Sequence, residues 1–173
     1  MDAIQNMLTR RSVKKYKSDA VPQELIEKIV EAGTFAPTGR NAQAPIILAI
    51  TNRQVRDELS KINAEIMGAP EGTDPFYNAP VVLVVLADKA RNTRVYDGSL
   101  VMGNMMLATH ALGLGGCWIH RAKETFERDE GKALLKSLGI EGEYEGIGNC
   151  VIGYPDHVPE TKPRKENWVY YVK

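Results

Sequence analysis

The sequence predicts a fold that mixes helices and strands, of the α/β or α+β class. Apolar runs of strand length alternate along the chain with segments whose apolar residues recur at helical spacing. A chain of 173 residues has the length of one domain, so we assign residues 1–173 to a single domain. The expected strands are 46–50, 81–86 and 149–155, and the expected helices are 2–9, 22–35, 53–67, 95–112 and 129–138.

The helix at 22–35 is marked by its ends. Pro22 suits the first helical position, and Glu24 lies in the first turn, where a carboxylate interacts favourably with the helix dipole. Gly33 is the expected stop. The apolar face consists of Leu25, Ile26, Ile29 and Val30, and the helix at 53–67 has a similar face of Val55, Leu59, Ile62 and Ile66.

The strand at 81–86 reads VVLVVL, which is apolar throughout and predicts a strand covered on both faces. Segment 112–119, LGLGGCWI, predicts a tight turn followed by a short strand. Its glycines lack the G-x-G-x-x-G spacing of a dinucleotide fingerprint, and they follow a helix rather than a strand. We therefore interpret them as turn residues.

Two apolar segments bear on assembly. The helix at 95–112 carries apolar residues around most of its circumference, which predicts burial on most sides, either in the domain core or at an oligomer interface. The tail at 158–173 is largely polar but ends in WVYYV at 168–172. We expect this apolar end to dock on its own globule or on a partner.

The composition, 43% hydrophobic and 25% charged, is ordinary for a soluble globular protein. No window of eighteen apolar residues occurs and the N-terminus lacks a signal-peptide run, so we expect a cytoplasmic protein. Cys117 and Cys150 are expected to be buried thiols in a reducing compartment rather than a disulfide. The three histidines lack partners at ligand spacing, so we expect no metal site.

Positive charge is concentrated near the N-terminus. The stretch TRRSVKKYKSD (9–19) holds five basic side chains, whereas the whole chain balances 22 basic against 22 acidic residues. A nucleic-acid arm would need a basic face with stacking residues, and only Tyr16 is aromatic nearby. A membrane patch would need an amphipathic basic helix or a lipidation site. We therefore expect no nucleic-acid and no membrane partner, which leaves a solvated charged face or a pocket for an anionic ligand.

Ser12 favours the pocket. It places a hydroxyl between arginines and Lys14, and guanidinium forks, a hydroxyl and an ammonium together suit a phosphate group. A second basic cluster, KPRK (162–165), lies far along the chain. The two clusters could converge on one phosphate.

Four segments in this order resemble the flavin-dependent nitroreductase family, whose members bind FMN. RRSVKKY (10–16) is similar to the family's R-R-S-x-R-x-F/Y, and APTGRNAQ (36–43) is similar to A-P-S/T-x-x-N-x-Q. NMMLATHALGLGGCWI (104–119) is similar to N-M-x-L-A-A-x-x-L-G-L-G-S-C-W-I, and VIGYP…KPRK (151–165) to I-G-Y-P…K-P-R. The resemblance implies an α+β, nitroreductase-like fold, with a central, mostly antiparallel sheet flanked by helices in an intertwined homodimer. It also implies FMN in two interface clefts.

The resemblance assigns the basic residues to the FMN phosphate, ribityl chain and ring edge. Lys14 stands where the family commonly has arginine, so it keeps the charge without the planar fork. Its cation would stabilise the negative charge that reduced flavin develops. Lys165 is a weaker candidate, and Lys15 and Lys17 are assigned to solvent. The expected contacts are Arg10, Arg11, Ser12 and Lys14 in the opening element and Lys162 and Arg164 in a closing phosphate clamp.

The loop at 36–43 matches the segment that, in the family, reaches across from the partner subunit. It would pack beside the dimethylbenzene end of the flavin and bond the ribityl hydroxyls. Some of its members also fit ordinary turn residues, Thr38 and Asn41 above all. The family's Q-P-W is replaced here by QAP (43–45). The matching residues are Pro37, Thr38, Gly39, Asn41 and Gln43.

The segment GGCWIHR (115–121) is implied to bring a backbone N–H toward flavin N5. The family usually continues W-I-G, whereas this chain has His120 and Arg121. His120 is a candidate contact of flavin or substrate that could donate a proton, or else a structural residue. The expected contacts here are Trp118, Ile119 and His120, with Asn63 as a further candidate from the helix at 53–67.

The resemblance implies an FMN-dependent oxidoreductase. NADH or NADPH would reduce the flavin, and a small-molecule acceptor such as a nitroaromatic or a quinone would then take the electrons in a ping-pong scheme. FMN carries the chemistry, so no catalytic side chain is required. The same scaffold could instead serve as a dehydrogenase, a dehalogenase or a flavin-modifying enzyme. Substrate specificity is then expected in residues 65–78 and around residues 121–128. A flavin-binding dimer without turnover is the remaining alternative.

Overall fold

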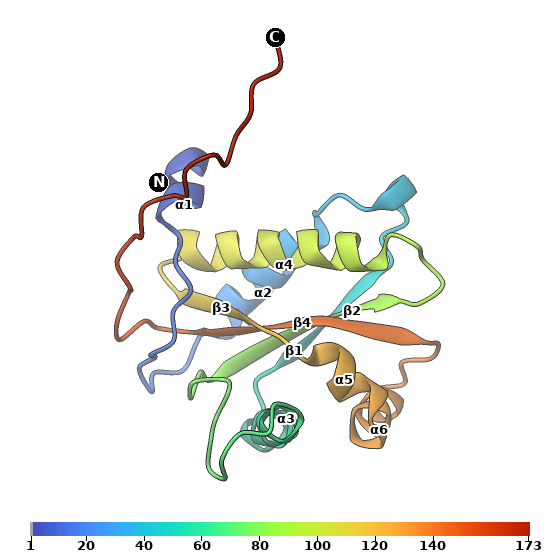
Figure 1. The fold of residues 1–173 in the computed structure, drawn as a ribbon. Coiled ribbons are helices and arrows are strands. Elements are labelled where there is room, and N and C mark those ends of the chain that lie inside the picture. Colours follow the sequence, from blue (N-terminus) through green and yellow to red (C-terminus); the bar gives the residue numbers. More distant parts are fainter. Residues whose placement is uncertain (1) are drawn as a thin grey trace.

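The computed structural model describes residues 2–173, which are built on one four-stranded sheet (Figure 1). The strands lie in the order β1–β2–β4–β3, and every neighbouring pair is antiparallel. The expectation of a mostly antiparallel sheet flanked by helices is confirmed. The strands are β1 (Pro45–Ile50), β2 (Val81–Asp88), β3 (Gly115–Ile119) and β4 (Tyr144–Gly153).

Helices cover both faces of the sheet, so its middle is shielded on both sides. In β2, no residue from Val81 to Ala87 is more than 2% exposed, as its unbroken apolar sequence predicts. Figure 1 shows α2 (Gln23–Thr34) and α4 (Arg94–Ala111) on one face, and α3 (Arg53–Ile66), α5 (Ala122–Glu127) and α6 (Asp129–Ser137) on the other.

The alternation of side chains along β2 feeds two separate cores. Val82 and Val84 share a core with residues of α3, α5 and α6. Leu83 and Val85 share the other core with residues of α2 and α4. Successive side chains of a strand point to opposite faces, so the sheet itself separates the two cores.

The N-terminal helix α1 (Ala3–Thr9) lies at the C-terminal end of α4. Asp2 caps it by accepting a hydrogen bond from the Gln5 N–H at 2.9 Å. The Asn6 side chain donates to the Leu107 carbonyl of α4 at 2.9 Å. A short 3-10 helix, η1 (Gly39–Asn41), lies in the loop before β1. Within residues 2–173, no helix is long and apolar enough to cross a membrane.

Two end residues of α2 act differently from the sequence expectation. Gly33 lies inside the helix, which ends at Thr34. A Cβ at Gly33 would stand 2.8 Å from the Met105 side chain, so the glycine allows α2 to approach α4 and does not stop the helix. Pro22 is the residue before the helix rather than its first member.

In the C-terminal half, the sequence prediction made β4 too short and missed α5. β4 begins at Tyr144 rather than at 149, because its first half carries Gly146 and Gly148, which hide the apolar pattern of a strand. The register of β4 on β2 also shifts between Val85 and Leu86. The helix α5 was not predicted, because its six residues make fewer than two turns and show no periodicity.

Two apolar surfaces remain open in the single chain. The prediction that the helix at 95–112 is buried on most sides is wrong for the chain alone, because Tyr96 is 72% exposed and Leu100 is 47% exposed. The apolar end of the tail, residues 168–172, does not dock on its own globule. Trp168 is 75% exposed, and the C-terminal segment extends away from the sheet and its helices (Figure 1). Open apolar surfaces of this kind are typical of contacts with another chain.

Candidate functional site

The basic opening stretch lies along the outer edge of β3. Ser12 forms a parallel bridge with Gly116, and the Val13 N–H donates to the Gly116 carbonyl at 3.1 Å. Gly115 permits this approach, because a Cβ there would stand 2.8 Å from the Val13 side chain. The structure therefore brings together two segments that are far apart in sequence and were both expected at a cofactor site.

Farther along, the stretch is tied to the residues that follow β4. Tyr16 bridges Pro155, which fixes the course of the backbone. The Lys15 ammonium pairs with the Asp156 carboxylate at 3.0 Å, with its side chain 71% exposed, so it faces solvent. Ser12 and Lys14 also have exposed side chains. A hydroxyl and an ammonium are therefore available to a ligand beside β3.

The two arginines of the stretch are paired differently. Arg11 donates to the Leu8 carbonyl at 2.8 Å and to the Thr161 hydroxyl. Arg10 has a buried Nη1 that has no hydrogen-bond partner among residues 2–173. A buried guanidinium nitrogen without an acceptor is costly, and an anionic ligand would satisfy it.

The contact between Arg11 and Thr161 joins the closing basic cluster to the opening one. Lys162 follows Thr161 directly, and the Arg164 guanidinium donates to the Lys162 carbonyl at 2.8 Å. Both basic side chains are exposed. The segment that carries the closing cluster is therefore tied to the opening cluster at Thr161, one residue before its first cation.

Beyond the end of β3, aromatic and polar groups border a cleft of about 670 Å³. The Trp118 ring packs over Gly148, where a Cβ would stand 2.5 Å from Nε1. This Nε1 is buried and has no partner in the described part of the chain. His120 is exposed, with its ring centroid 6.2 Å from that of Trp118. Val95 and Ser99 of α4 also line the cleft.

Two neighbouring β3 side chains point into the core instead. Ile119 is 8% exposed and packs in the core beneath α3, α5 and α6, so the structure does not place its side chain in the cleft. Burial raises the pKa of the Cys117 thiol, and Ser12 and the nearby cations only partly oppose this effect. Cys117 and Cys150 are both free and buried, as predicted. Residues 2–173 hold no group of three side chains suited to a metal ion.

The loop at 36–43 is anchored at the first turn of α4. The Gly39 N–H donates to Asp97 Oδ1 at 2.9 Å, and the Thr93 hydroxyl donates to Asp97 Oδ2 at 2.8 Å. The opening stretch instead follows α1, which is bonded to the last turns of α4. A helix of 18 residues is about 27 Å long. One chain therefore does not bring this loop to residues 10–14.

The same loop presents open polar groups to its surroundings. The Gln43 N–H donates to the Thr38 hydroxyl at 3.0 Å, and the Gln43 side chain donates to the Asn41 side chain at 3.3 Å. Asn41 and Gln43 both have positive φ, a conformation that L-residues rarely adopt. Pro37, Asn41 and Gln43 are exposed. Within residues 2–173, Thr38 and Gln43 also line a cavity of about 350 Å³ together with residues of α2, β1 and α4.

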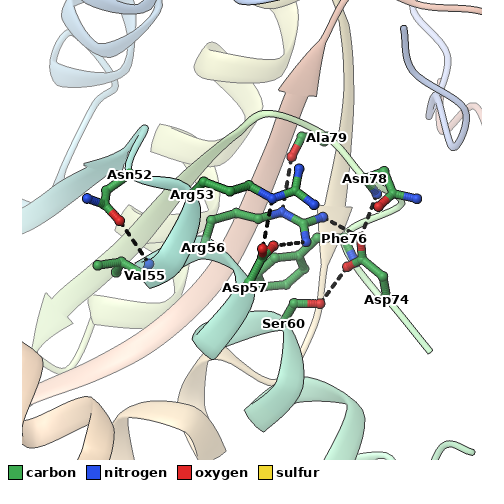
Figure 2. Close-up of polar contacts among 10 residues, drawn as sticks. All are labelled: Asn52, Arg53, Val55, Arg56, Asp57, Ser60, Asp74, Phe76, Asn78 and Ala79. Atoms are coloured by element: carbon green, nitrogen blue, oxygen red, sulfur yellow. Dashed lines mark hydrogen bonds and ion pairs between the residues drawn. The ribbon is translucent and has the colours of Figure 1, made fainter. Parts of the chain in front are cut away.

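A clasp of polar side chains holds the loop at 68–80 against α3 (Figure 2). The Asp74 carboxylate accepts hydrogen bonds from Arg56 and Ser60, both at 2.5 Å. Arg56 is 2% exposed, so its charge is compensated almost wholly inside the protein. The remaining bonds run from the backbone N–H groups of Phe76 and Asn78 to Asp74, and from Arg56 to Asp57 and the Ala79 carbonyl.

The clasp orients a residue beside the basic stretch. Tyr77, with a φ of 55°, carries its ring to 5.7 Å from the Lys14 ammonium. Burial alone would raise the pKa of Asp74, but the bonds from Arg56, Ser60 and the backbone hold that pKa below its ordinary value. Sequence reasoning missed the clasp. The available signal was Arg56 itself, a charged residue three positions before Leu59 on the buried side of the helix.

Known proteins are similar to this chain in sequence and in fold. The sequence profile of the Nitroreductase family matches residues 7–156. A relative from Methanothermobacter thermautotrophicus, named for NADH dehydrogenase or NAD(P)H nitroreductase activity, is 32% identical over 166 residues, which span 94% of this chain and 82% of the relative. A NADPH-flavin oxidoreductase from Vibrio harveyi is 26% identical over 94% of this chain and 70% of its own.

Solved structures agree with these sequence matches. A Bacteroides fragilis nitroreductase with bound FMN superposes with a TM-score of 0.91 at 25% identity, over 100% of both chains. A Desulfitobacterium hafniense nitroreductase, at 21% identity and a TM-score of 0.89 over 100% of both chains, shows the same fold. The family expected from the four sequence segments is confirmed, and this chain belongs to the nitroreductase family.

Proposed function

We propose that this protein is an FMN-dependent oxidoreductase that passes electrons from NADH or NADPH to a small-molecule acceptor such as a nitroaromatic or a quinone. The observation that carries the proposal is the buried, unpaired Nη1 of Arg10 beside the exposed side chains of Ser12 and Lys14. The names of the relatives support the same activity, because they describe NAD(P)H nitroreductase and flavin oxidoreductase enzymes. Bound FMN would supply the chemistry by taking up and releasing two electrons.

The cations are proposed to hold the phosphate end of FMN. Arg10 offers an unpaired buried donor. Lys162 and Arg164 offer exposed charges on the segment that the contact between Arg11 and Thr161 ties to the opening stretch. Arg11 donates three hydrogen bonds to its own chain, to the Leu8 and Arg10 carbonyls and to the Thr161 hydroxyl, so we assign it chiefly to holding the two segments together. Charge-assisted bonds of this kind are the strongest available to a phosphate.

Lys14 and the cleft beyond β3 are proposed to meet the ring. Tyr77 lies beside the Lys14 ammonium and limits where that cation can move. The buried Nε1 of Trp118 and the exposed imidazole of His120 stand at the same cleft. His120 can hold a proton at its imidazole and release it to a bound acceptor.

The site is proposed to be completed by a second copy of the chain. The loop at 36–43 lies at the far end of α4 from residues 10–14, so we infer that Pro37, Thr38, Gly39, Asn41 and Gln43 serve the site of the partner subunit. The exposed face of α4 would then lie between the two subunits. Residues 1–173 act in this scheme as one FMN-binding domain.

The tail is proposed to bind the edge of the partner's sheet. β1 is an edge strand, and within residues 2–173 no segment pairs with its outer side. A cleft of about 390 Å³ lies beside β1. It is lined by residues of this strand together with Val55, Leu134 and Leu138. An extended segment such as 168–172 can add to such an edge through backbone hydrogen bonds, with its apolar side chains in the cleft.

The decisive experiment is a visible absorption spectrum of the gently purified protein, followed by anaerobic addition of NADH and NADPH. A yellow protein that bleaches supports the proposal. A yellow protein that stays oxidised would mean that FMN is bound but that NAD(P)H does not reduce it, which refutes the NAD(P)H-dependent activity. A colourless protein that also rejects added FMN refutes the site. In the same spectrum, Arg10→Ala should retain less FMN than the wild type. Lys17→Ala is the matched control and should retain FMN, because Lys17 is an exposed cation of the same stretch.

A further inference from the structure

Two buried amides converge on one backbone carbonyl at the cleft. The Asn63 side chain of α3 donates to the His120 carbonyl at 2.7 Å. The Asn149 side chain of β4 donates to the same carbonyl at 3.2 Å, and to the Ile119 carbonyl at 3.3 Å. Asn63 is 0% exposed and Asn149 is 2% exposed. Two fully buried polar side chains thus share one task, although apolar residues would fill these core positions at less cost.

The orientation of the Asn63 amide follows from its hydrogen-bond partner. A carbonyl oxygen only accepts hydrogen bonds, so the amide nitrogen of Asn63 must face His120. The Asn63 oxygen is buried and has no partner within residues 2–173. The Asn63 amide therefore binds the His120 carbonyl although its own oxygen stays buried without a hydrogen bond. This costly arrangement indicates that the position of the His120 carbonyl is important.

The peptide that carries this carbonyl presents its N–H on the opposite side. No cis peptide occurs among the described residues, so the His120 carbonyl and the Arg121 N–H point in opposite directions. The carbonyl points toward α3, which covers one face of the sheet (Figure 1). The cleft beside His120 is lined by residues of α4 and of α5, and Arg121 is itself one of its lining residues. The Arg121 N–H points away from α3 at this cleft, and it donates to no acceptor within residues 2–173.

Arg121 is held in this orientation from both sides. Its φ of 74° and ψ of 12° are left-handed, a conformation that residues with a Cβ rarely adopt. Its own carbonyl accepts from the Thr125 N–H at 2.9 Å and from the Thr125 hydroxyl at 2.8 Å. The preceding peptide is held by the two amides. A strained residue that its surroundings fix so completely is typical of a functional site.

We propose that Asn63 and Asn149 are positioning residues that hold the Arg121 N–H as a fixed hydrogen-bond donor to the flavin ring. This inference rests on the proposed function and adds to it. Oxidised flavin N5 can accept a hydrogen bond, whereas N5 of reduced flavin carries its own hydrogen. A fixed N–H at that atom therefore favours the oxidised state, and loosening it favours the reduced state.

The test compares Asn63→Leu with Asn104→Leu. Leucine keeps the number and branching of the heavy atoms of asparagine, although its methyl groups are bulkier, and it removes the donor. Asn104 is the matched control, because its side chain also donates to a backbone carbonyl, that of Ala32 at 3.1 Å, away from the cleft. We expect Asn63→Leu to lose about tenfold in affinity for oxidised FMN relative to reduced FMN. That change raises the two-electron midpoint potential by about 30 mV. Asn104→Leu should leave the potential unchanged.

A measurement on the wild type covers the case in which Asn63→Leu fails to fold. In a ¹⁵N spectrum, addition of FMN should shift the Arg121 amide well beyond the average of the other amides. A folded Asn63→Leu variant with the wild-type potential overturns this inference alone, as does an Arg121 amide that FMN leaves in place. A wild type that binds no FMN overturns the proposed function first, and the inference with it.

Discussion

Replacing Asp74 by alanine should destabilise the protein far more than a typical surface change. Asp74 is the carboxylate that compensates the buried guanidinium of Arg56, at 2.5 Å. Breaking a buried ion pair by removing one partner costs about 3–5 kcal/mol, because the other charge stays buried. Arg56 would still keep Asp57 and the Ala79 carbonyl. We therefore expect the lower end of this range, about 3 kcal/mol.

The assay is urea unfolding of the wild type and four variants: Asp74→Ala, Asp57→Ala, Arg56→Met and the double variant Arg56→Met/Asp74→Ala. Asp57→Ala is the matched control, because Asp57 also pairs with Arg56, at 2.8 Å, but its side chain is 46% exposed. An exposed partner contributes about 1 kcal/mol or less. The double variant Arg56→Met/Asp74→Ala removes the stranded charge. It should be less destabilised than the sum of the two single variants by at least about 1 kcal/mol.

Thermal melting provides a second reading of the same effect. For a chain of this length, about 3 kcal/mol corresponds to a fall in Tm of roughly 6–12 °C. The reasoning is refuted if Asp74→Ala costs no more than Asp57→Ala, or if the effects of Arg56→Met and Asp74→Ala simply add. Either result would mean that water reaches the guanidinium and that the clasp is not a buried ion pair.

Three further predictions concern the cofactor, acid stability and backbone strain. Arg164→Ala should weaken FMN binding by roughly 10- to 100-fold, from the loss of a charge-assisted bond of about 1.5–3 kcal/mol, whereas Lys17→Ala should bind FMN normally in a fluorescence titration. Because the folded state lowers the pKa of Asp74 from its ordinary value of 3.8, its contribution is present above that pH and is lost as the pH falls through the folded pKa. Asp74→Asn should therefore flatten the decline of the unfolding free energy below about pH 4, and an unchanged decline would contradict the assignment. Arg121→Gly should raise the unfolding free energy by roughly 0.5–1 kcal/mol, because the left-handed conformation costs an L-residue about 1–2 kcal/mol and glycine's chain entropy offsets part of the gain; equal or lower stability would show that Arg121 is not strained.

A last prediction concerns assembly. Deleting residues 166–173 should weaken the proposed homodimer, because these residues carry the exposed apolar end of the tail. Sedimentation of the full and shortened chains at several concentrations measures the effect. An equally tight dimer after deletion would place the tail elsewhere.

The sequence by itself determined the order and type of most elements. VVLVVL at 81–86 specified a strand covered on both faces, because an apolar β-branched run has no polar face to offer water. The spacing of Leu25, Ile26 and Ile29 specified a helix for the same kind of local reason. The four family segments could also be recognised, because each is a short, contiguous pattern. Where the pattern was too short or was interrupted by glycine, as in α5 and the first half of β4, the sequence carried no usable signal.

Only the tertiary structure decided which residues meet. Ser12 lies beside Gly116, and Arg11 reaches Thr161, through contacts that no local pattern encodes. The length of α4 separates the loop at 36–43 from residues 10–14, so one chain does not bring them together. The structure also revealed the hydrogen bonds that the buried side chains of Arg56, Asn63 and Asn149 make. Their partners are chosen by packing between distant elements, because a buried polar group must find its hydrogen bonds wherever the fold brings them.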